Sequence, residues 1–291
     1  FFIADWHSLT THPHPGDVTA NVRKILSEYL ACGIDPEKAA IYVQSDVKEV
    51  LELYLYLNMN AYLGELQRVT SFKEKARKQP ENVNAGLLTY LTLMAADILI
   101  HRADKVPVGK DQEQNMEMAR KFARRFNTIY GVEFFPEPQS YSFGGDAIKV
   151  PGLDGSGKMG KSEGNAIYLI DDAATIRKKV MKAVTDSGPT QPNSEKPEAI
   201  ANLFTMLKIV SSADTYDYFN EKYNACEIRY GDLKKQLAED IVNFTSPIRE
   251  RILAYAADTE YMDKVAREGA EKARASADKT IREVRKIIGF N

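Results

Sequence analysis

The sequence is poor in cysteine and has no long apolar run. Two cysteines occur among its 291 residues, Cys32 and Cys226, and they lie far apart. This scarcity excludes a disulfide-stapled scaffold and the closely spaced Cys/His ligands of a metal site. We therefore predict no metal centre and a reducing, cytoplasmic location. No apolar stretch approaches the roughly 20 residues that a membrane-spanning helix needs, so we predict no membrane partner.

An excess of charge of either sign is also missing. The 39 Lys and Arg residues nearly balance the 41 Asp and Glu residues, which leaves a net charge of −2. This balance excludes a nucleic-acid-binding surface built on overall positive charge, but it leaves room for a local basic patch. The sequence shows no internal repeat, low-complexity segment or signal peptide.

The chain begins with the letters FFIAD, without an initiating methionine or a turn residue. A short continuous apolar run of this kind is typical of a strand buried on both faces. Such a strand belongs in the interior of a sheet, so we expect a further segment of the protein to precede Phe1.

The pattern of apolar residues changes past the middle of the sequence. Apolar runs at 1–4, 39–43 and 106–109 alternate with helical patterns, which predicts a parallel α/β sheet. From residue 195 onward the pattern is almost entirely helical. We predict an α/β protein with a Rossmann-like parallel-sheet catalytic domain over 1–170 and an all-helical domain over 171–291. The last helix could pack back on the first domain.

The stretch GSGKMGKS, residues 155–162, fits three patterns. It matches the phosphate loop of NTPases, the Gly-rich dinucleotide fingerprint and, with one difference, the KMSKS loop that serves amino-acid activation on ATP. The first two need a helix directly after the loop, because the helix N-terminus holds the phosphate. Here Glu163-Gly164-Asn165 and an extended apolar run follow, which favours the lysine loop. A P-loop NTPase remains an alternative, and a solvated surface loop would fit this motif taken alone.

Several separated stretches together resemble a class I aminoacyl-tRNA synthetase, in particular the tryptophanyl-tRNA synthetases. They are FFIADWHSLTTHP, YLGELQRVTSFKEK, GLLTYLTLMAADILIHRAD, VPVGKDQEQNMEMAR, GKMGKS and AVTDS. The resemblance implies a tryptophan–tRNA ligase that forms tryptophanyl-adenylate from tryptophan and Mg-ATP and then charges tRNA(Trp). The tyrosyl-tRNA synthetases are the sibling alternative: the run from Met94 to Asp97 favours tryptophan, whereas Asn115 leans toward tyrosine.

The resemblance also implies a set of ATP-binding and catalytic residues. Phosphoryl transfer depends on positioning and charge stabilisation, so lysines and a Mg²⁺ ion that arrives with ATP are the expected tools. The implied catalytic residues are Lys158, Lys161, Ser162 and Lys75, the last in a polar stretch expected to be a mobile loop. The implied ATP-binding residues are Gly109, Lys110, Asp111, Lys149, Val150, Met159 and Gly160, together with the three loop residues Lys158, Lys161 and Ser162. No tightly bound cofactor is expected.

The specificity for tryptophan is expected to depend on Asp97. An acid on a mostly apolar helix is costly to bury unless it meets a donor, and the indole N–H is such a donor. A pocket built for that hydrogen bond rejects analogues that lack it. By resemblance, Met94, Val106 and Val108 would form the walls, His7 would border the ring, and Tyr90 and Gln112 would hold the ammonium and carboxylate groups. Without the resemblance, Asp97 could instead pair with Arg102 or Lys105, and Lys75 could be a solvated charge.

Two departures from the family pattern keep a non-catalytic paralogue open. The HIGH-like signature is expected just before Phe1, so a polypeptide starting at Phe1 should not activate tryptophan. Gly160 also stands where the family usually has serine. The expected partners are tRNA(Trp), tryptophan, ATP and a second copy of the chain, with the apolar stretch 50–63 as the candidate contact between the two copies.

Overall fold

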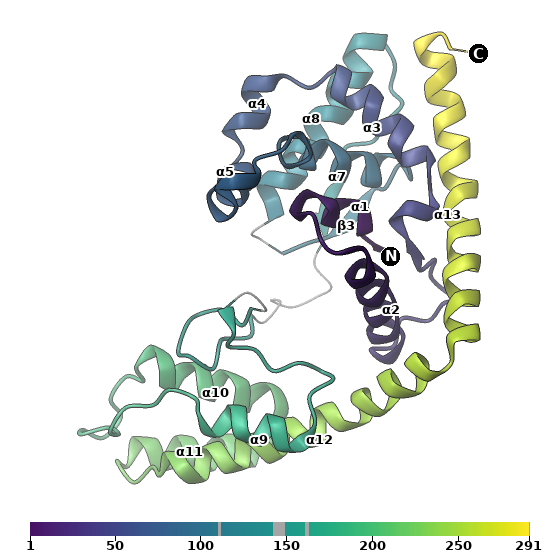
Figure 1. The fold of residues 1–291 in the computed structure, drawn as a ribbon. Coiled ribbons are helices and arrows are strands. Elements are labelled where there is room, and N and C mark those ends of the chain that lie inside the picture. The colour runs from purple at the N-terminus through teal and green to yellow at the C-terminus, as the bar shows by residue number, and fades with distance from the viewer. Residues whose placement is uncertain (110–111, 142–148, 161–162, 291) are drawn as a thin grey trace. The chain divides into compact units, whose positions relative to one another are not determined.

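The computed structural model describes residues 1–109, 112–141, 149–160 and 163–290 (Figure 1). The chain forms two compact units. The first comprises Phe1–Ala147 together with Asp258–Asn291, and the second comprises Ile148–Ala257.

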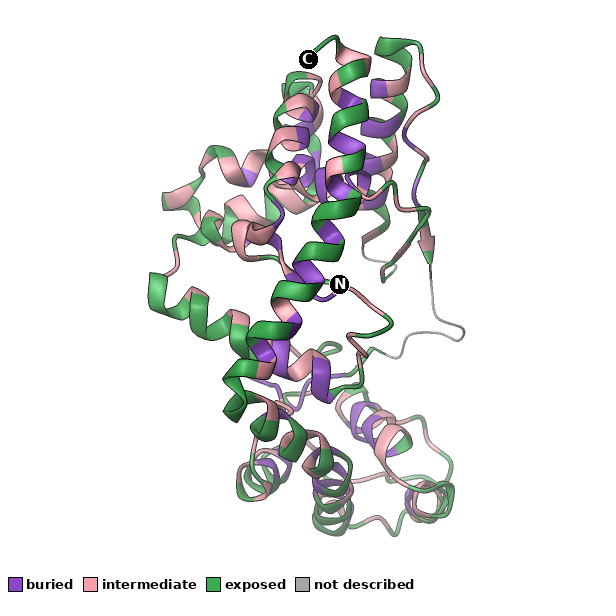
Figure 2. Cartoon of the chain, turned by 90° about the vertical axis from the view of Figure 1, so that its right-hand side faces the viewer, coloured by how far each residue is buried: buried purple, intermediate pink, exposed green. Residues whose placement is uncertain are grey.

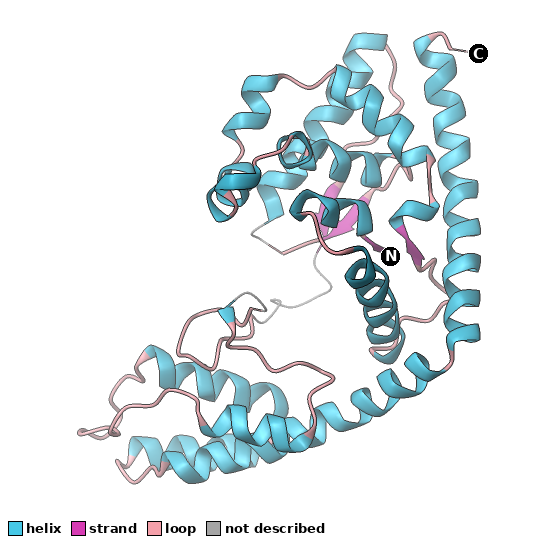
Figure 3. Cartoon of the chain, in the orientation of Figure 1, coloured by secondary structure: helices cyan, strands magenta, loops and turns pink. Residues whose placement is uncertain are grey.

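The first unit contains short parallel strands among many helices (Figure 3). Its strands are β1 (Phe2–Ile3), β2 (Tyr42–Val43), β3 (Lys105–Pro107) and β4 (Gln139–Tyr141). Its α-helices are α1 (Asp5–Ser8), α2 (Pro15–Ala31), α3 (Glu49–Met59), α4 (Leu63–Arg68), α5 (Thr70–Lys78), α6 (Ala85–Leu88), α7 (Tyr90–Leu99), α8 (Glu113–Tyr130) and α13 (Thr259–Ile288). Three 3₁₀ turns, η1 (Leu9–Thr11), η2 (Gln44–Asp46) and η3 (Pro80–Asn82), complete the unit.

The strands form two parallel pairs within the described part of the chain. Phe2 lies opposite Tyr42 in the β1–β2 pair, and Lys105 lies opposite Gln139 in the β3–β4 pair. Parallel pairing needs a crossover between the partners, and helices supply it in both cases. The parallel α/β character is therefore present, while a single larger Rossmann-like sheet remains a prediction.

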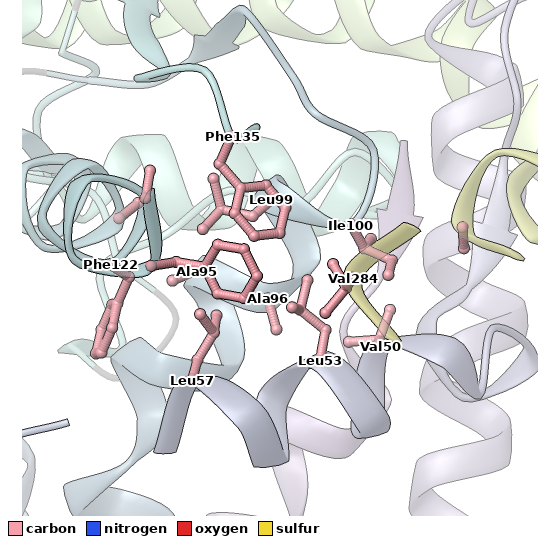
Figure 4. Close-up of a cluster of buried hydrophobic side chains, with 14 of the residues drawn as sticks. Val50, Leu53, Leu57, Ala95, Ala96, Leu99, Ile100, Phe122, Phe135 and Val284 are labelled. Carbon is pink, nitrogen blue, oxygen red and sulfur yellow. The ribbon is translucent and has the colours of Figure 1, made fainter. Parts of the chain in front are cut away.

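The core of the first unit is centred on α7, which is apolar on nearly all sides. Leu53 and Leu57 of α3 lie against Ala95, Ala96 and Leu99 of α7, as Figure 4 shows. The other side of α7 packs on α8, whose buried residues recur at helical spacing. This central packing fixes the direction of α7, and with it the position of its acid.

The last helix, α13, belongs to the first unit. Its buried positions include Ala270, Ala273 and Ala277, and buried and exposed positions alternate around the helix in Figure 2. At Gly269 the helix approaches β2 so closely that an added Cβ would lie 1.9 Å from the Ile41 carbonyl oxygen. Only glycine fits there without displacing the strand backbone.

The second unit is a helical cluster that also carries the lysine loop. Its helices are α9 (Ala173–Met181), α10 (Glu198–Val210), α11 (Ala213–Asn224) and α12 (Tyr230–Ala257). We expected a division at 170/171, but the compact units divide at 147/148. The reason is that the segment before α9 packs on these helices. Leu153 joins their hydrophobic core and its carbonyl accepts from the Val184 N–H, while the Asn202 amide donates to the Ser156 carbonyl.

Candidate active site

Asp97 is a buried acid in the last turn of the apolar helix α7. Its residue surface is 5% exposed, and both carboxylate oxygens accept from the Gln44 side-chain nitrogen, at 2.9 and 2.8 Å. Burial raises the pKa of Asp97 to about 8, and the hydrogen bond from Gln44 opposes that rise. The alternative pairing with Arg102 or Lys105 does not form. Arg102 stacks over the Phe134 ring and Lys105 lies over the Tyr141 ring.

His7 lies beside Asp97, on the short helix α1 that directly follows β1. Its Nδ1 is 3.1 Å from the Gln44 side-chain nitrogen and 3.8 Å from an Asp97 oxygen. The His7 ring meets the Tyr90 ring edge-on, with the centroids 4.4 Å apart. Burial lowers the pKa of His7, so the imidazole is neutral at pH 7. The structure thus brings together His7, Tyr90 and Asp97, all predicted from the sequence.

Lys75 joins this cluster from a helix and not from a loop. We expected a mobile loop because the stretch is polar, but it forms α5, whose lysines, glutamate and alanine are good helix formers. The Lys75 ammonium lies 4.1 Å from the centroid of the Tyr90 ring. Its pKa is lowered, first by burial and then by the nearby charge of Lys78. Among the described residues, no carboxylate forms an ion pair with Lys75. A half-buried cation of this kind is suited to bind an anionic ligand.

A cavity of about 200 Å³ borders the cluster. His7 and Tyr90 line it, and Trp6, Tyr54 and Leu93 supply its apolar walls. Asp97 is not among its lining residues and is linked to it through His7. Sequence reasoning did not single out Trp6 or Tyr54, because aromatic residues at helical spacing are usually core residues.

The other residues predicted to bind tryptophan occupy neighbouring elements. Met94 lies one turn before Asp97 on α7 and packs against the core. Val106 and Val108 are half-buried in and just after β3, where the Val108 N–H donates to the Tyr141 carbonyl. Gln112 precedes α8 and its side-chain oxygen accepts from the Asn115 amide at 2.6 Å. Their contact with tryptophan remains a prediction.

The lysine loop lies in the second unit and is organised by Asn165. The Asn165 side-chain nitrogen donates to Asp154, to the Ser156 hydroxyl and to the Lys158 carbonyl, at 2.9, 3.0 and 3.1 Å. Its side-chain oxygen accepts from the Gly160 N–H at 2.9 Å. Asn165 is buried, and sequence reasoning did not find it. The available signal was a polar residue after a glycine, which does not reveal so many partners.

The loop does not have the form of a phosphate loop. In the described part of the chain after residue 162, the first α-helix is α9, which begins at Ala173 with the Asp172 carboxylate capping the Thr175 N–H. The strand–loop–helix arrangement that both Gly-rich phosphate loops need is therefore not formed, and the P-loop NTPase and dinucleotide hypotheses are wrong on this point. The Lys158 side chain is exposed, whereas Met159 packs on the core of the unit and its N–H donates to the Val150 carbonyl.

Four of the predicted ATP-binding residues, Lys110, Asp111, Lys161 and Ser162, lie outside the described residues. Gly109, Lys149 and Val150 are described and exposed, and the Gly109 carbonyl accepts from the Gln112 N–H.

Among the described residues, no His, Cys, Asp and Glu side chains gather in a group of three or more that could hold a metal ion. Within the same residues, no helix is both long enough and apolar enough to cross a membrane.

Most of the sequence matches a known family of enzymes. The family model described as tRNA synthetases class I (W and Y) matches residues 1–246. The chain therefore belongs to the class I tRNA synthetases of the tryptophan and tyrosine group, and its fold is of the class I synthetase type.

Within this family, the chain is similar to tryptophan enzymes of several bacteria. The chain is 78% identical over 290 residues to the tryptophan–tRNA ligase of Porphyromonas gingivalis, across 100% of this chain and 89% of that protein. It is 39% identical over 294 residues to the tryptophan–tRNA ligase of Listeria monocytogenes serotype 4b, across 100% of this chain and 87% of that protein. The crystal structure of tryptophanyl-tRNA synthetase from Campylobacter jejuni complexed with ADP and tryptophan has a TM-score of 0.86 at 33% identity, covering 99% of this chain and 89% of that chain.

Proposed function

We propose that this chain is a tryptophan–tRNA ligase. The tryptophan carboxylate attacks the α-phosphorus of ATP, which forms tryptophanyl-adenylate and releases pyrophosphate. A ribose hydroxyl at the 3′ end of tRNA(Trp) then takes the tryptophanyl group and releases AMP. The observation that carries the proposal is the buried Asp97 carboxylate, held beside His7 and Tyr90 in a chain that is 78% identical to a tryptophan–tRNA ligase.

We propose that Asp97 recognises the indole N–H. The acid has a raised pKa because burial disfavours its charge, and a further donor would favour the charged form. Tryptophan brings that donor, whereas phenylalanine does not and would leave the acid short of a partner. In the same proposal Met94, Val106 and Val108 enclose the ring, while Tyr90 and Gln112 bind the amino-acid ends. The named relatives support tryptophan over tyrosine as the substrate.

The proposed ligands of ATP are cationic side chains and backbone groups. Lys158, Lys161 and Lys75 are the proposed ligands of the triphosphate, with Ser162 adding a hydroxyl. Their charges would stabilise the negative charge that builds up on the departing pyrophosphate. Mg²⁺ would arrive with ATP and be bound by phosphate oxygens. The ribose and adenine are assigned to Gly109, Lys110, Asp111, Lys149 and Val150, and the adjacent loop backbone to Met159 and Gly160.

The wider architecture follows the same proposal. We infer that the two parallel strand pairs belong to one Rossmann-like sheet of a catalytic domain, and that the helical second unit binds the anticodon end of tRNA(Trp). Charging of tRNA for translation would take place in the cytoplasm. Two basic residues of α9 are already paired within the second unit, Arg177 with Glu239 and Lys179 with Asp171, so they are weaker candidates for tRNA contacts.

A homodimer is part of the proposal, and α3 offers the contact. Leu51, Leu55 and Met59 recur every four residues on one face of the helix and are 42%, 49% and 75% exposed. Tyr62 and Leu63, which follow directly, are also exposed. Apolar residues grouped in this way usually mark an interface. The stripe falls within the stretch 50–63 predicted from the sequence.

The test is amino-acid-dependent ATP–pyrophosphate exchange on the full-length gene product. Tryptophan, tyrosine and no amino acid are compared, followed by charging of tRNA(Trp). We expect exchange with tryptophan only. Exchange with tyrosine would reassign the substrate, and no exchange by folded protein would favour the non-catalytic paralogue, in which case Gly160→Ser is the first variant to make.

A further inference from the structure

Gln44 occupies a position to which sequence reasoning gave no role. It opens η2 immediately after β2, at the carboxyl end of a parallel strand, where α/β proteins commonly place ligand-binding groups. Its side chain is buried, with 1% of the residue exposed. A buried amide needs partners for its donors and its acceptor, and the partners of Gln44 are two residues of the proposed tryptophan site.

The orientation of the Gln44 amide follows from its neighbours. The side-chain nitrogen lies 2.9 and 2.8 Å from the two oxygens of Asp97. An ionised carboxylate only accepts hydrogen bonds, so the amide must turn its nitrogen toward it. The same nitrogen is also the nearer amide atom to His7 Nδ1, at 3.1 Å against 3.3 Å for the amide oxygen. One amide group therefore contacts both Asp97 and His7.

These contacts have consequences for both partners. By donating to Asp97, Gln44 favours its charged form and restricts rotation of the carboxylate. A carboxylate offers about four lone-pair positions, so each oxygen retains acceptor capacity for a ligand. A second N–H directed at His7 Nδ1 makes that atom the acceptor and leaves the ring proton on Nε2. Without Gln44, nothing from that side would oppose the effect of burial, so the pKa of Asp97 would rise further and the protonated acid would present a hydroxyl donor.

We propose that Gln44 is a positioning residue that determines specificity for an aromatic ligand carrying a ring N–H. It orients the Asp97 carboxylate as an acceptor for that ring N–H and fixes the tautomer of His7. The inference rests on the proposed function, because it assumes that Asp97 receives the indole N–H. It adds a residue 53 positions away from Asp97 in sequence to the determinants of specificity.

The test compares tryptophan with β-(3-benzothienyl)alanine, in which sulfur replaces the ring N–H and the shape is kept. Dissociation constants are measured by calorimetry on the full-length protein, so the result does not depend on turnover. We expect the wild-type protein to prefer tryptophan at least about tenfold, since a hydrogen bond to a charged group is among the stronger ones. Gln44→Met should reduce this preference to within about threefold while affinity for the sulfur analogue changes little.

Control variants make the outcomes distinguishable. Thr92→Val removes another fully buried polar group from α7 and should leave the preference unchanged. Gln44→Asn keeps an amide but is one methylene shorter, so it should also weaken the preference if Gln44→Met does not fold. Equal loss of affinity for both ligands would make Gln44 merely structural, and an unchanged or increased preference would also overturn the inference. If Asp97→Asn leaves the preference intact, the role proposed for Asp97 is wrong instead.

Discussion

The pH dependence of stability should reveal the state of Asp97. The ordinary pKa of an aspartate is 3.8, and burial raises that of Asp97 to about 8. At pH values between these two pKa values, Asp97 is protonated in the folded chain and ionised in the unfolded chain. The free energy of unfolding therefore falls as the pH rises. The contribution is fully present below about pH 4 and is lost progressively up to about pH 8. Asparagine cannot ionise, so Asp97→Asn should remove this slope.

The magnitude follows from the two pKa values. Each pKa unit corresponds to 1.36 kcal/mol, so between pH 5.5 and 8 the stability of the wild-type protein relative to Asp97→Asn should fall by about 3 kcal/mol. The variant is expected to fold because the Gln44 amide can rotate to present its oxygen to the new amide. Burial lowers the pKa of His7 and of His101. The stability that these neutral imidazoles contribute is lost as the pH falls, which opposes the trend from Asp97. The difference between the two proteins isolates the effect of Asp97.

The assay is urea unfolding at several pH values, followed by fluorescence of Trp6. This is the sole tryptophan of the chain and lies in the first unit beside His7, so it reports on the unit that contains Asp97. Asp263→Asn, which changes an exposed acid on α13, serves as the control and should parallel the wild-type protein. If the Asp97→Asn profile also runs parallel to the wild type, the pKa of Asp97 is not raised in the folded chain and the burial argument fails.

Three further changes test other parts of the structure. Gly269→Ala should lower the free energy of unfolding by roughly 1–3 kcal/mol because its Cβ would meet the Ile41 carbonyl. Gly64→Ala on α4 should be neutral or slightly stabilising, since its Cβ would meet only the Arg68 side chain, at 4.0 Å; equal effects in urea unfolding would contradict this. Asn165→Ala should raise the KM for ATP in pyrophosphate exchange and leave the KM for tryptophan nearly unchanged, since it releases the lysine loop; a change in the tryptophan KM alone would be inconsistent. Lys75→Met should lower kcat in exchange by about 100-fold with tryptophan affinity largely retained, and an unchanged kcat would remove Lys75 from the phosphate ligands.

Local patterns were sufficient for much of the fold. The apolar runs at 1–4, 39–43 and 106–109 predicted strands at β1, β2 and β3 because strand-forming runs are recognisable within a few residues. The helix around Lys75 was missed because its sequence is strongly polar and has no apolar stripe to reveal the helical period. The two compact units divide at 147/148, and this position depends on which helices the segment around Leu153 packs against, which local sequence does not reveal.

The sequence by itself determined the chemistry of this protein: a pair of lysines in a glycine-rich loop, an acid on an apolar helix, and the motifs that link them to a family. These are properties of residue type and short spacing, so they can be read without coordinates. Only the tertiary structure decided that Gln44 supplies the donor for Asp97 and that Asn165 organises the lysine loop. A hydrogen bond between distant residues needs two atoms within about 3 Å, and packing of the whole unit, not local sequence, brings them to that distance.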